Sequence, residues 1–289
     1  MSPRTIAKNR HGIMLFIRWL ETVCQLTGVD RIGKEHLHAW QRRLSSMTVK
    51  SGRPAKPQTI NTYIENVKGW LGYLSTLGYI RKDIVHELKY VKIPSRLPGS
   101  VLTHAQMRKL LAKIPTGNMP GYRDRAMLEL LYSSGIRAGE LLGLDVEHVD
   151  FKNRTLIVTG KGDKQRVVPF GKTALRHLNT YVRAVRPFML KDRSEKALFV
   201  NLKGTRLHYR CFLDYVQAHA QRAGFENITP HSFRRSCTTE LIRGGANMYH
   251  VKEFLGHESL DTLKSYTRLT INDLKKTHEK CHPRERDRE

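Results

Sequence analysis

The spacing of apolar residues predicts helices through the first part of the chain. One stripe indicates a helix over 5–26 that stops at Gly28. The apolar positions of this stripe are Ile13, Phe16, Ile17, Leu20 and Val23. A second helix is predicted around Leu37, Trp40 and Leu44, where apolar residues again recur at helical spacing.

A third helix is predicted to begin at Pro57, because proline suits the first turn of a helix, and to end before Gly78. Its apolar stripe consists of Ile60, Ile64, Val67, Leu71 and Leu74. A short fourth helix is predicted from Asp83. These four segments together are typical of a small helical bundle, in which the stripes form the core.

The segment 91–103 (VKIPSRLPGSVLT) separates this bundle from the rest of the chain. It contains two prolines and a glycine, and each proline disfavours helix in the residue before it. We therefore expect a helical domain at 1–92, an extended linker at 93–102 and a second domain at 103–289.

The second domain is predicted to be mainly helical with a small antiparallel β-sheet. Thr103 and Gln106 form a capping-box pattern at the start of a helix. That helix carries Met107, Leu110, Leu111 and Ile114 on one face. A further helix is predicted near 123–132, and the β-branched runs of 155–170 flank a Gly- and Lys-containing turn, which indicates a hairpin.

The strong positive charge of the chain gives the first indication of a binding partner. The chain of 289 residues has 51 Lys and Arg against 26 Asp and Glu, a formal net charge of +25, and an anionic partner would offset the self-repulsion. Nucleic acid is the first candidate partner, although a basic protein kept soluble by its charge remains the alternative. The four cysteines form no CxxC pair, and we expect them to be reduced thiols. No apolar run is long enough to span a bilayer, and no segment is typical of a signal peptide. We therefore expect a cytoplasmic protein with no membrane partner.

Two motifs place a basic residue where chemistry could use it. GIRAGELLGL puts Arg137 at the start of an amphipathic helix, one turn before Glu140. An arginine there is usually a solvated cap or the salt-bridge partner of that glutamate. The hairpin turn puts Lys161 between two glycines, where a lysine is most often a solvated charge.

Two further motifs contain histidines. PHSFRRS puts His231 and Arg234 three residues apart, on one face of a helix, a pairing that occurs by chance in many proteins. LGHESLDTLKSYTRL puts His257 nine residues ahead of Tyr266. Gly256 is predicted to end one helix, and Ser259 to cap the next.

Taken together, in order and in spacing, these motifs resemble those of the tyrosine recombinase (phage-integrase) family, its Xer-type and transposon members above all. The resemblance covers about residues 100–270 in motif detail, with Thr262 at a position where the family favours a small hydroxyl. It implies a catalytic domain preceded by a helical core-binding (SAM-like) domain. The first hundred residues match that domain in size, basicity and pattern only.

The resemblance also implies a role for each of six side chains in attack on a DNA phosphodiester. Arginines suit the non-bridging phosphate oxygens because a guanidinium donates a fork of hydrogen bonds and stays ionised. A phenol with a pKa of about 10 needs a proton acceptor in order to attack, and the leaving sugar oxygen needs a proton. The expected roles are Arg137, Arg234 and His257 as phosphate ligands, Tyr266 as nucleophile, His231 as base and Lys161 as acid.

No cofactor or metal is expected, since the arginines supply the positive charge. His278, Cys281 and His282 resemble a zinc site only superficially, because a second ligand pair is lacking. Glu140 is given a supporting role, while Arg235 and Lys264 are treated as surface charges.

The expected partners are a double-stranded DNA recombination site and three further copies of the chain in a homotetramer. The segment 269–280 is expected to pack on a neighbouring copy, and a second recombinase or an accessory protein is left open. Because the chain enters its first helix almost at once, we expect a simple recombinase without an additional arm-site DNA-binding domain. Two alternatives remain: a DNA-binding regulator with a derelict active site, and a type IB topoisomerase.

Overall fold

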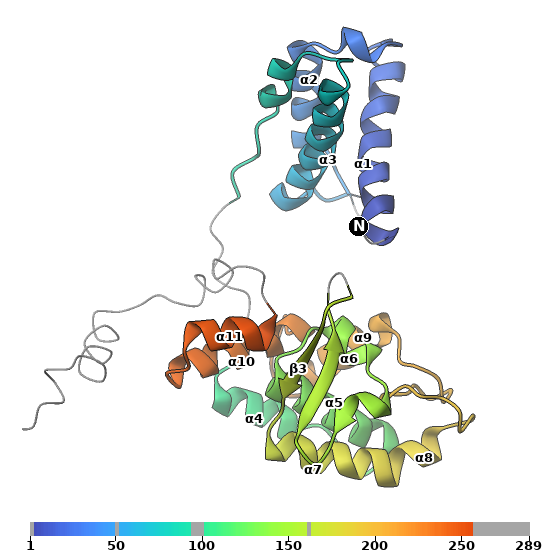
Figure 1. Cartoon of the computed structure of the whole chain (residues 1–289), viewed down its shortest axis with the longest axis vertical. Coiled ribbons are helices and arrows are strands. Elements are labelled where there is room, and N and C mark those ends of the chain that lie inside the picture. The colour runs from blue at the N-terminus through green and yellow to red at the C-terminus, as the bar shows by residue number, and fades with distance from the viewer. Residues whose placement is uncertain (1–2, 50–51, 94–100, 161–162, 257–289) are drawn as a thin grey trace, which may run out of the picture. The chain divides into compact units, whose positions relative to one another are not determined.

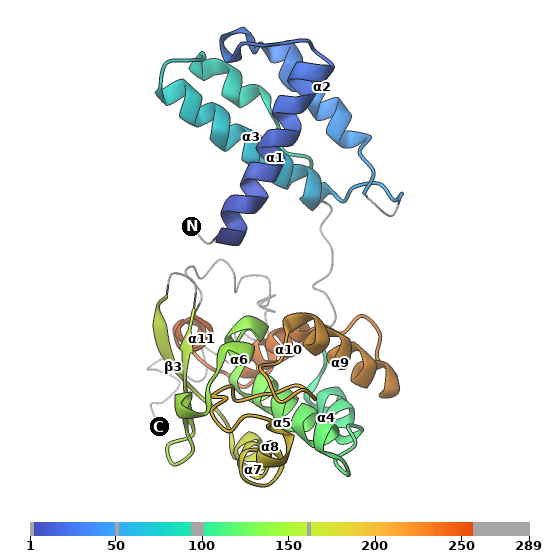
Figure 2. The same ribbon diagram turned by 90° about the vertical axis from the view of Figure 1, so that its right-hand side faces the viewer.

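The chain divides into two compact units, Met1–Arg96 and Leu97–Glu289. The structure is a computed structural model that describes residues 3–49, 52–93, 101–160 and 163–256 (Figures 1 and 2). Residues 94–100 of the predicted linker lie outside the described residues. In the described ranges, no helix is both long and apolar enough to cross a membrane.

The first unit is a small bundle of helices joined by short 3-10 turns. Its elements are α1 (Pro3–Thr22), η1 (Val29–Arg31), α2 (Lys34–Ser45), α3 (Pro57–Thr76) and η2 (Lys82–Glu87). Pro57 occupies the first turn of α3, as predicted.

Aromatic rings from α1 and α2 fill the centre of this bundle. The ring of Trp40 lies 5.2 Å from that of Phe16 and 5.3 Å from that of Trp19, measured between centroids. The predicted stripe of α3 is confirmed, since its first four members are buried. The prediction for Val23 is wrong: α1 ends at Thr22, and Val23 is 61% exposed. The helix predicted from Asp83 is the 3-10 helix η2.

The second unit is mostly helical and contains one three-stranded sheet. Its first elements are α4 (His104–Ala112), α5 (Met119–Ser134), α6 (Ala138–Gly143), η3 (Val146–His148), β1 (Val149–Asp150), β2 (Thr155–Thr159) and β3 (Gln165–Pro169). The remaining elements are α7 (Lys172–Thr180), the π-helical turn η4 (Tyr181–Val185), α8 (Arg186–Met189), α9 (Tyr209–Arg222), α10 (Pro230–Arg243) and α11 (Met248–Leu255).

Helix α5 forms the centre of this unit and is buried on most of its sides. It packs against α7 and α10, and Figure 2 shows it among the other helices of the unit. The predicted capping box of α4 is confirmed, because the Thr103 hydroxyl accepts from the Gln106 N–H and the Gln106 side chain accepts from the Thr103 N–H. The four apolar residues predicted for this helix are all buried.

The sheet is antiparallel in the order β1-β2-β3. The predicted hairpin is confirmed as β2 and β3, in a register that pairs Val158 with Arg166. The sequence did not predict β1, which contributes only two residues to the sheet. Val158 and Val168 point into the core. Arg166 is two residues before Val168, so its side chain leaves the strand on the same, inward face of the sheet.

Candidate active site

Arg137 lies at the N-cap of α6, as the sequence predicted. Its backbone N–H donates to Glu140 Oε2 (2.9 Å), and its Nη1 donates to Glu140 Oε1 (2.8 Å). Its Nη2 donates to the carbonyl oxygen of Gly256, 3.0 Å away and 119 residues later in the chain. The side chain remains 40% exposed, so the guanidinium is held by protein groups on one side and open on another.

Arg234 is buried in α10, and its guanidinium also binds the C-terminal end of α11. Its Nη1 donates to the Gly135 carbonyl (2.6 Å), and its Nη2 donates to the Leu255 carbonyl (2.7 Å). Gly135 and Gly256 are the C-caps of α5 and α11, both in the left-handed conformation with φ of 59° and 64°. Arg137 and Arg234 therefore bind consecutive carbonyls at the end of α11, where the predicted helix end at Gly256 is confirmed.

His231 lies one turn before Arg234 at the start of α10, and it is exposed. Partial burial lowers its pKa below the ordinary value of 6.5, and the positive charges of Arg235, Arg234 and Arg137 lower it further. The imidazole is therefore neutral at neutral pH and able to accept a proton. The structure thus brings together Arg137, His231 and Arg234, which lie almost a hundred residues apart in the chain.

A second arginine, which the sequence analysis did not single out, binds the same carboxylate as Arg137. Arg166 of β3 donates from Nη1 to Glu140 Oε1 and from Nη2 to Glu140 Oε2, both at 2.9 Å. Glu140 is 8% exposed. Burial raises the pKa of Glu140, but hydrogen bonds from Arg166 and from Arg137 outweigh this and hold it below its ordinary value. The alternation of β3 could have revealed Arg166, since a charge on the inward face of a strand needs a partner.

Lys161, His257 and Tyr266 lie outside the described residues, as do Ser259, Thr262, the segment 269–280 and the residues of the rejected zinc motif. Their neighbours in sequence are described. Gly160, which follows β2 and precedes Lys161, would carry a Cβ 3.7 Å from Glu140 Oε1. Gly256, which precedes His257, accepts the hydrogen bond from Arg137. Both residues lie next to the carboxylate and guanidinium groups described above.

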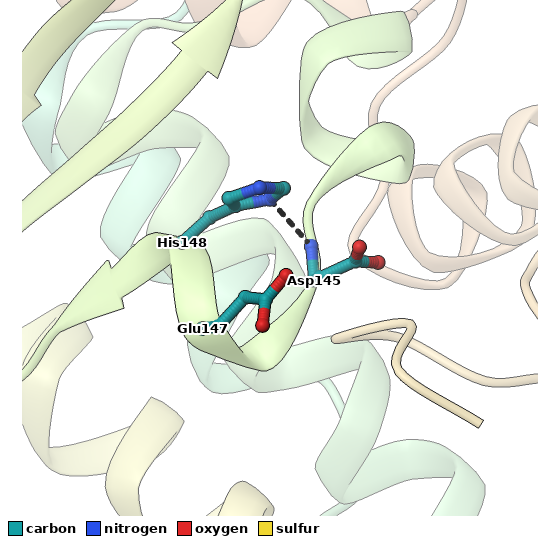
Figure 3. A group of neighbouring side chains, drawn as sticks. All are labelled: Asp145, Glu147 and His148. Carbon is teal, nitrogen blue, oxygen red and sulfur yellow. Dashed lines mark hydrogen bonds between the residues drawn. The ribbon is translucent and has the colours of Figure 1, made fainter. Parts of the chain in front are cut away.

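A group of potential metal ligands lies at η3, which follows α6 in the chain (Figure 3). One ligand atom from each of Asp145, Glu147 and His148 lies within 4.8 Å of the others. Ordinary interactions account for the group, because the Asp145 N–H donates to His148 Nδ1 (3.0 Å) and the Asp145 carboxylate pairs with Arg206. We therefore interpret it as a polar turn that caps η3.

Comparisons with known proteins agree with this geometry. Residues 100–272 match the model of the phage integrase family. Tyrosine recombinase XerD of Staphylococcus epidermidis is 31% identical over 98% of this chain and 94% of its own length. Tyrosine recombinase XerC of Bifidobacterium longum is 44% identical over 56% of this chain, and the chain spans about half of that relative, 48% of its length.

Solved structures show the same fold at lower sequence identity. The Tn1549 transposon integrase in complex with transposon right end DNA has a TM-score of 0.76 at 18% identity, over 97% of this chain and 94% of that one. XerH site-specific recombinase bound to difH substrate has a TM-score of 0.71 at 20% identity, over 94% of this chain and 78% of that one. The chain therefore belongs to the phage integrase family of tyrosine recombinases.

Proposed function

We propose that this chain recombines DNA at a specific site through a covalent bond between Tyr266 and a 3′-phosphate. The observation that carries the proposal is the convergence of Arg137 and Arg234 on the consecutive carbonyls of Leu255 and Gly256, directly before His257. A phosphate held at the exposed side of Arg137 would lie near His231 and near Gly256, the last described residue before the part of the sequence that contains the nucleophile.

Arg137 and Arg234 form the phosphate clamp. Hydrogen bonds within the described residues use two of the five side-chain N–H donors of Arg137, which leaves donors for non-bridging phosphate oxygens. Negative charge builds on those oxygens as the phosphorus is attacked, and fixed guanidinium groups stabilise it without reorganising. His257 supplies a third donor to the same oxygens.

Proton transfer in the reaction is assigned to two side chains. Tyr266 gives its phenolic proton to His231 as its oxygen forms the bond to phosphorus. The bond from phosphorus to the 5′ oxygen of the next nucleotide breaks, and Lys161 gives that oxygen a proton. The products are a 3′-phosphotyrosyl bond and a free 5′ hydroxyl. Because the covalent bond conserves the phosphodiester, the reverse attack rejoins strands without ATP, metal or cofactor.

The two units have different roles in this proposal. We assign DNA binding through the core-binding fold to residues 1–92 and catalysis to 103–289, joined by a linker at 93–102. The division of the chain between Arg96 and Leu97 falls within that linker. The net charge of +25 suits a duplex DNA partner, and this partner would place the protein in the cytoplasm.

Four copies of the chain would synapse two sites and exchange strands in pairs through a Holliday junction, for integration, excision or resolution. A second recombinase or an accessory protein is compatible with this assembly. The segment 269–280 is proposed to pack on a neighbouring copy.

The proposal is tested by covalent capture of host DNA with the full chain. Wild-type protein is expected to give a covalent adduct on a denaturing gel, and sequencing of the captured DNA gives its target. Tyr266→Phe removes the attacking oxygen and should abolish the adduct while leaving DNA binding intact. Tyr249→Phe is the matched control, because Tyr249 is an exposed tyrosine of α11, and it should leave the adduct unchanged. An adduct formed by Tyr266→Phe would contradict the assignment.

A further inference from the structure

Glu140 is shared by two guanidinium groups that come from different elements. Arg137 reaches it from the start of its own helix, and Arg166 reaches it from the second strand of the hairpin. Both carboxylate oxygens accept from Arg166 in a two-pronged pair, and both also accept from Arg137, one from its side chain and one from its backbone. Movement of Arg166 therefore changes the oxygen positions that orient Arg137.

Arg166 also lies against the end of α11. A Cβ built on Gly256 would fall 2.9 Å from both Cζ and Nε of Arg166, closer than side-chain carbons approach such atoms. The guanidinium thus packs on the α-carbon of the residue before His257, while the carbonyl of that residue accepts from Arg137. A side chain at this position would have to displace the Arg166 guanidinium, and the φ of 64° also favours glycine.

We propose that Arg166 is a positioning residue for strand cleavage: through Glu140 it orients the phosphate-binding guanidinium of Arg137, and through Gly256 it holds the C-terminal end of α11, directly before His257 in the sequence. This inference rests on the proposed function. It also ties the hairpin that carries Lys161 to the arginine clamp, because Arg166 lies in the strand that follows the hairpin turn.

A purely structural ion pair offers a direct contrast within the same unit. Arg125 pairs with Glu129 on α5 at 2.8 Å, and its side chain is 17% exposed, compared with 18% for Arg166. The carboxylates are similarly buried, at 9% and 4% exposed. The difference is that Glu140 also binds Arg137. Arg125→Gln is therefore the control for the loss of a half-buried arginine–carboxylate pair.

The test uses the full chain and a nicked duplex that carries the sequence recovered by covalent capture. Single-turnover cleavage is measured at saturating DNA for wild type, Arg166→Gln, Arg166→Lys and Arg125→Gln. Arg166→Gln should cleave about 10- to 100-fold more slowly with DNA affinity little changed, because a small displacement of a catalytic group costs that much. Arg166→Lys, which folds with the charge retained but lacks the two-pronged geometry, should recover only part of the rate. Arg125→Gln should cleave at the wild-type rate.

The pH profile of cleavage is a second readout, because a loss of stability alone would not shift it. Arg137 and Arg166 are the charged groups that the described residues place on Glu140. Removing Arg166 takes away one of the two groups that oppose the effect of burial, so the pKa of this carboxyl should rise. A protonated Glu140 no longer holds Arg137, so the acid limb of the cleavage profile should move to higher pH in Arg166→Gln and stay in place in Arg125→Gln. In Glu140→Gln, the additional change Arg166→Gln should slow cleavage less than it does in wild type, because the route through Glu140 is already lost and only the contact with Gly256 remains to be removed.

Failure of this inference is distinguishable from failure of the proposed function. Wild-type protein that forms no adduct through Tyr266 contradicts the function itself. Active wild type with Arg166→Gln cleaving as fast as Arg125→Gln, or with the same pH profile as wild type, overturns the positioning role alone. Additive losses in the Glu140 double variant would overturn it as well.

Discussion

The second unit contains two clusters of arginine, carboxylate and histidine that differ in how completely they are closed. The closed cluster consists of Arg123, Asp124 and His219, whose side chains are 1%, 7% and 7% exposed. The open cluster consists of Arg137, Glu140, Arg166, His231 and Arg234, in which Arg137 is 40% exposed and His231 is exposed. The same types of side chain occur in both.

Contacts within the protein account for the closed cluster. Arg123 donates from Nε and Nη2 to Asp124 (2.9 and 2.7 Å) and from Nη1 to the Val200 carbonyl (3.0 Å), and it lies over the ring of Tyr215. His219 Nε2 hydrogen bonds to the other Asp124 oxygen at 2.9 Å. Nothing in this arrangement faces outward, so it contributes to the folded state and offers no group to a ligand.

The open cluster has one buried carboxylate, Glu140, for three guanidinium groups. Arg137 and Arg166 bind this carboxylate, and Arg137 is 40% exposed. Excess positive charge at a partly exposed position is costly in the free protein, and a bound phosphate would offset it. The two clusters therefore differ in the positive charge that they leave unmatched, and only slightly in their residue types.

The largest expected effect is on stability, in the closed cluster. Arg123→Met keeps the aliphatic stem on Tyr215 but leaves Asp124 buried with only His219. We expect the free energy of unfolding to fall by roughly 3–5 kcal/mol, the usual cost of breaking a buried ion pair. Urea denaturation measures it. Cleavage per folded molecule should be unchanged, and a selective loss of cleavage would show that the closed cluster takes part in catalysis.

The second effect is on catalysis, in the open cluster. Arg137→Ala should slow single-turnover cleavage about 100- to 1000-fold, as expected for a lost donor to transition-state charge. Its cost in stability should be about 1 kcal/mol or less, because the side chain is 40% exposed and Arg166 still pairs with Glu140. Cleavage and urea denaturation are measured on the same preparation. A large loss of stability with normal cleavage would reverse the assignment of the two clusters.

The smallest effect is a shift in pH dependence. After partial burial, the charge of Arg235 is the largest cause that lowers the pKa of His231. Arg235→Gln should therefore raise the pKa of His231. As the pH falls, the imidazole would then take up its proton, and lose its capacity to act as a base, at a higher pH than in wild type. The acid limb of the cleavage rate should move to higher pH by a small amount, measured under single-turnover conditions. An unmoved limb would indicate that another group accepts the phenolic proton.

Local signals were enough to predict much of the fold. The capping box of Thr103 and Gln106, the proline start of α3 and the glycine end of α11 each depend on residues a few positions apart. Strand β1 was missed because two residues carry no periodicity, and their pairing with β2 depends on a contact that sequence spacing does not show. Val23 continues the apolar period of α1, but the helix ends one residue earlier.

The candidate site could be predicted as far as its residues stand in short motifs whose order and spacing resemble those of a known family. Arg137, His231 and Arg234 were named from motifs, and the structure places them together. Arg166 and the closed cluster were missed, because pairing across 26 and 95 residues is set by tertiary packing. An arginine next to an aspartate in α5 looks like an ordinary surface pair until burial is known.

The most direct measurement is the identity of the residue that carries the DNA. Wild-type protein is trapped on a nicked duplex with its captured sequence, digested with protease and nuclease, and analysed by mass spectrometry. A nucleotide attached through its 3′-phosphate to Tyr266 is the expected result. A nucleotide on any other side chain, or strand exchange with no attached nucleotide, would contradict the account.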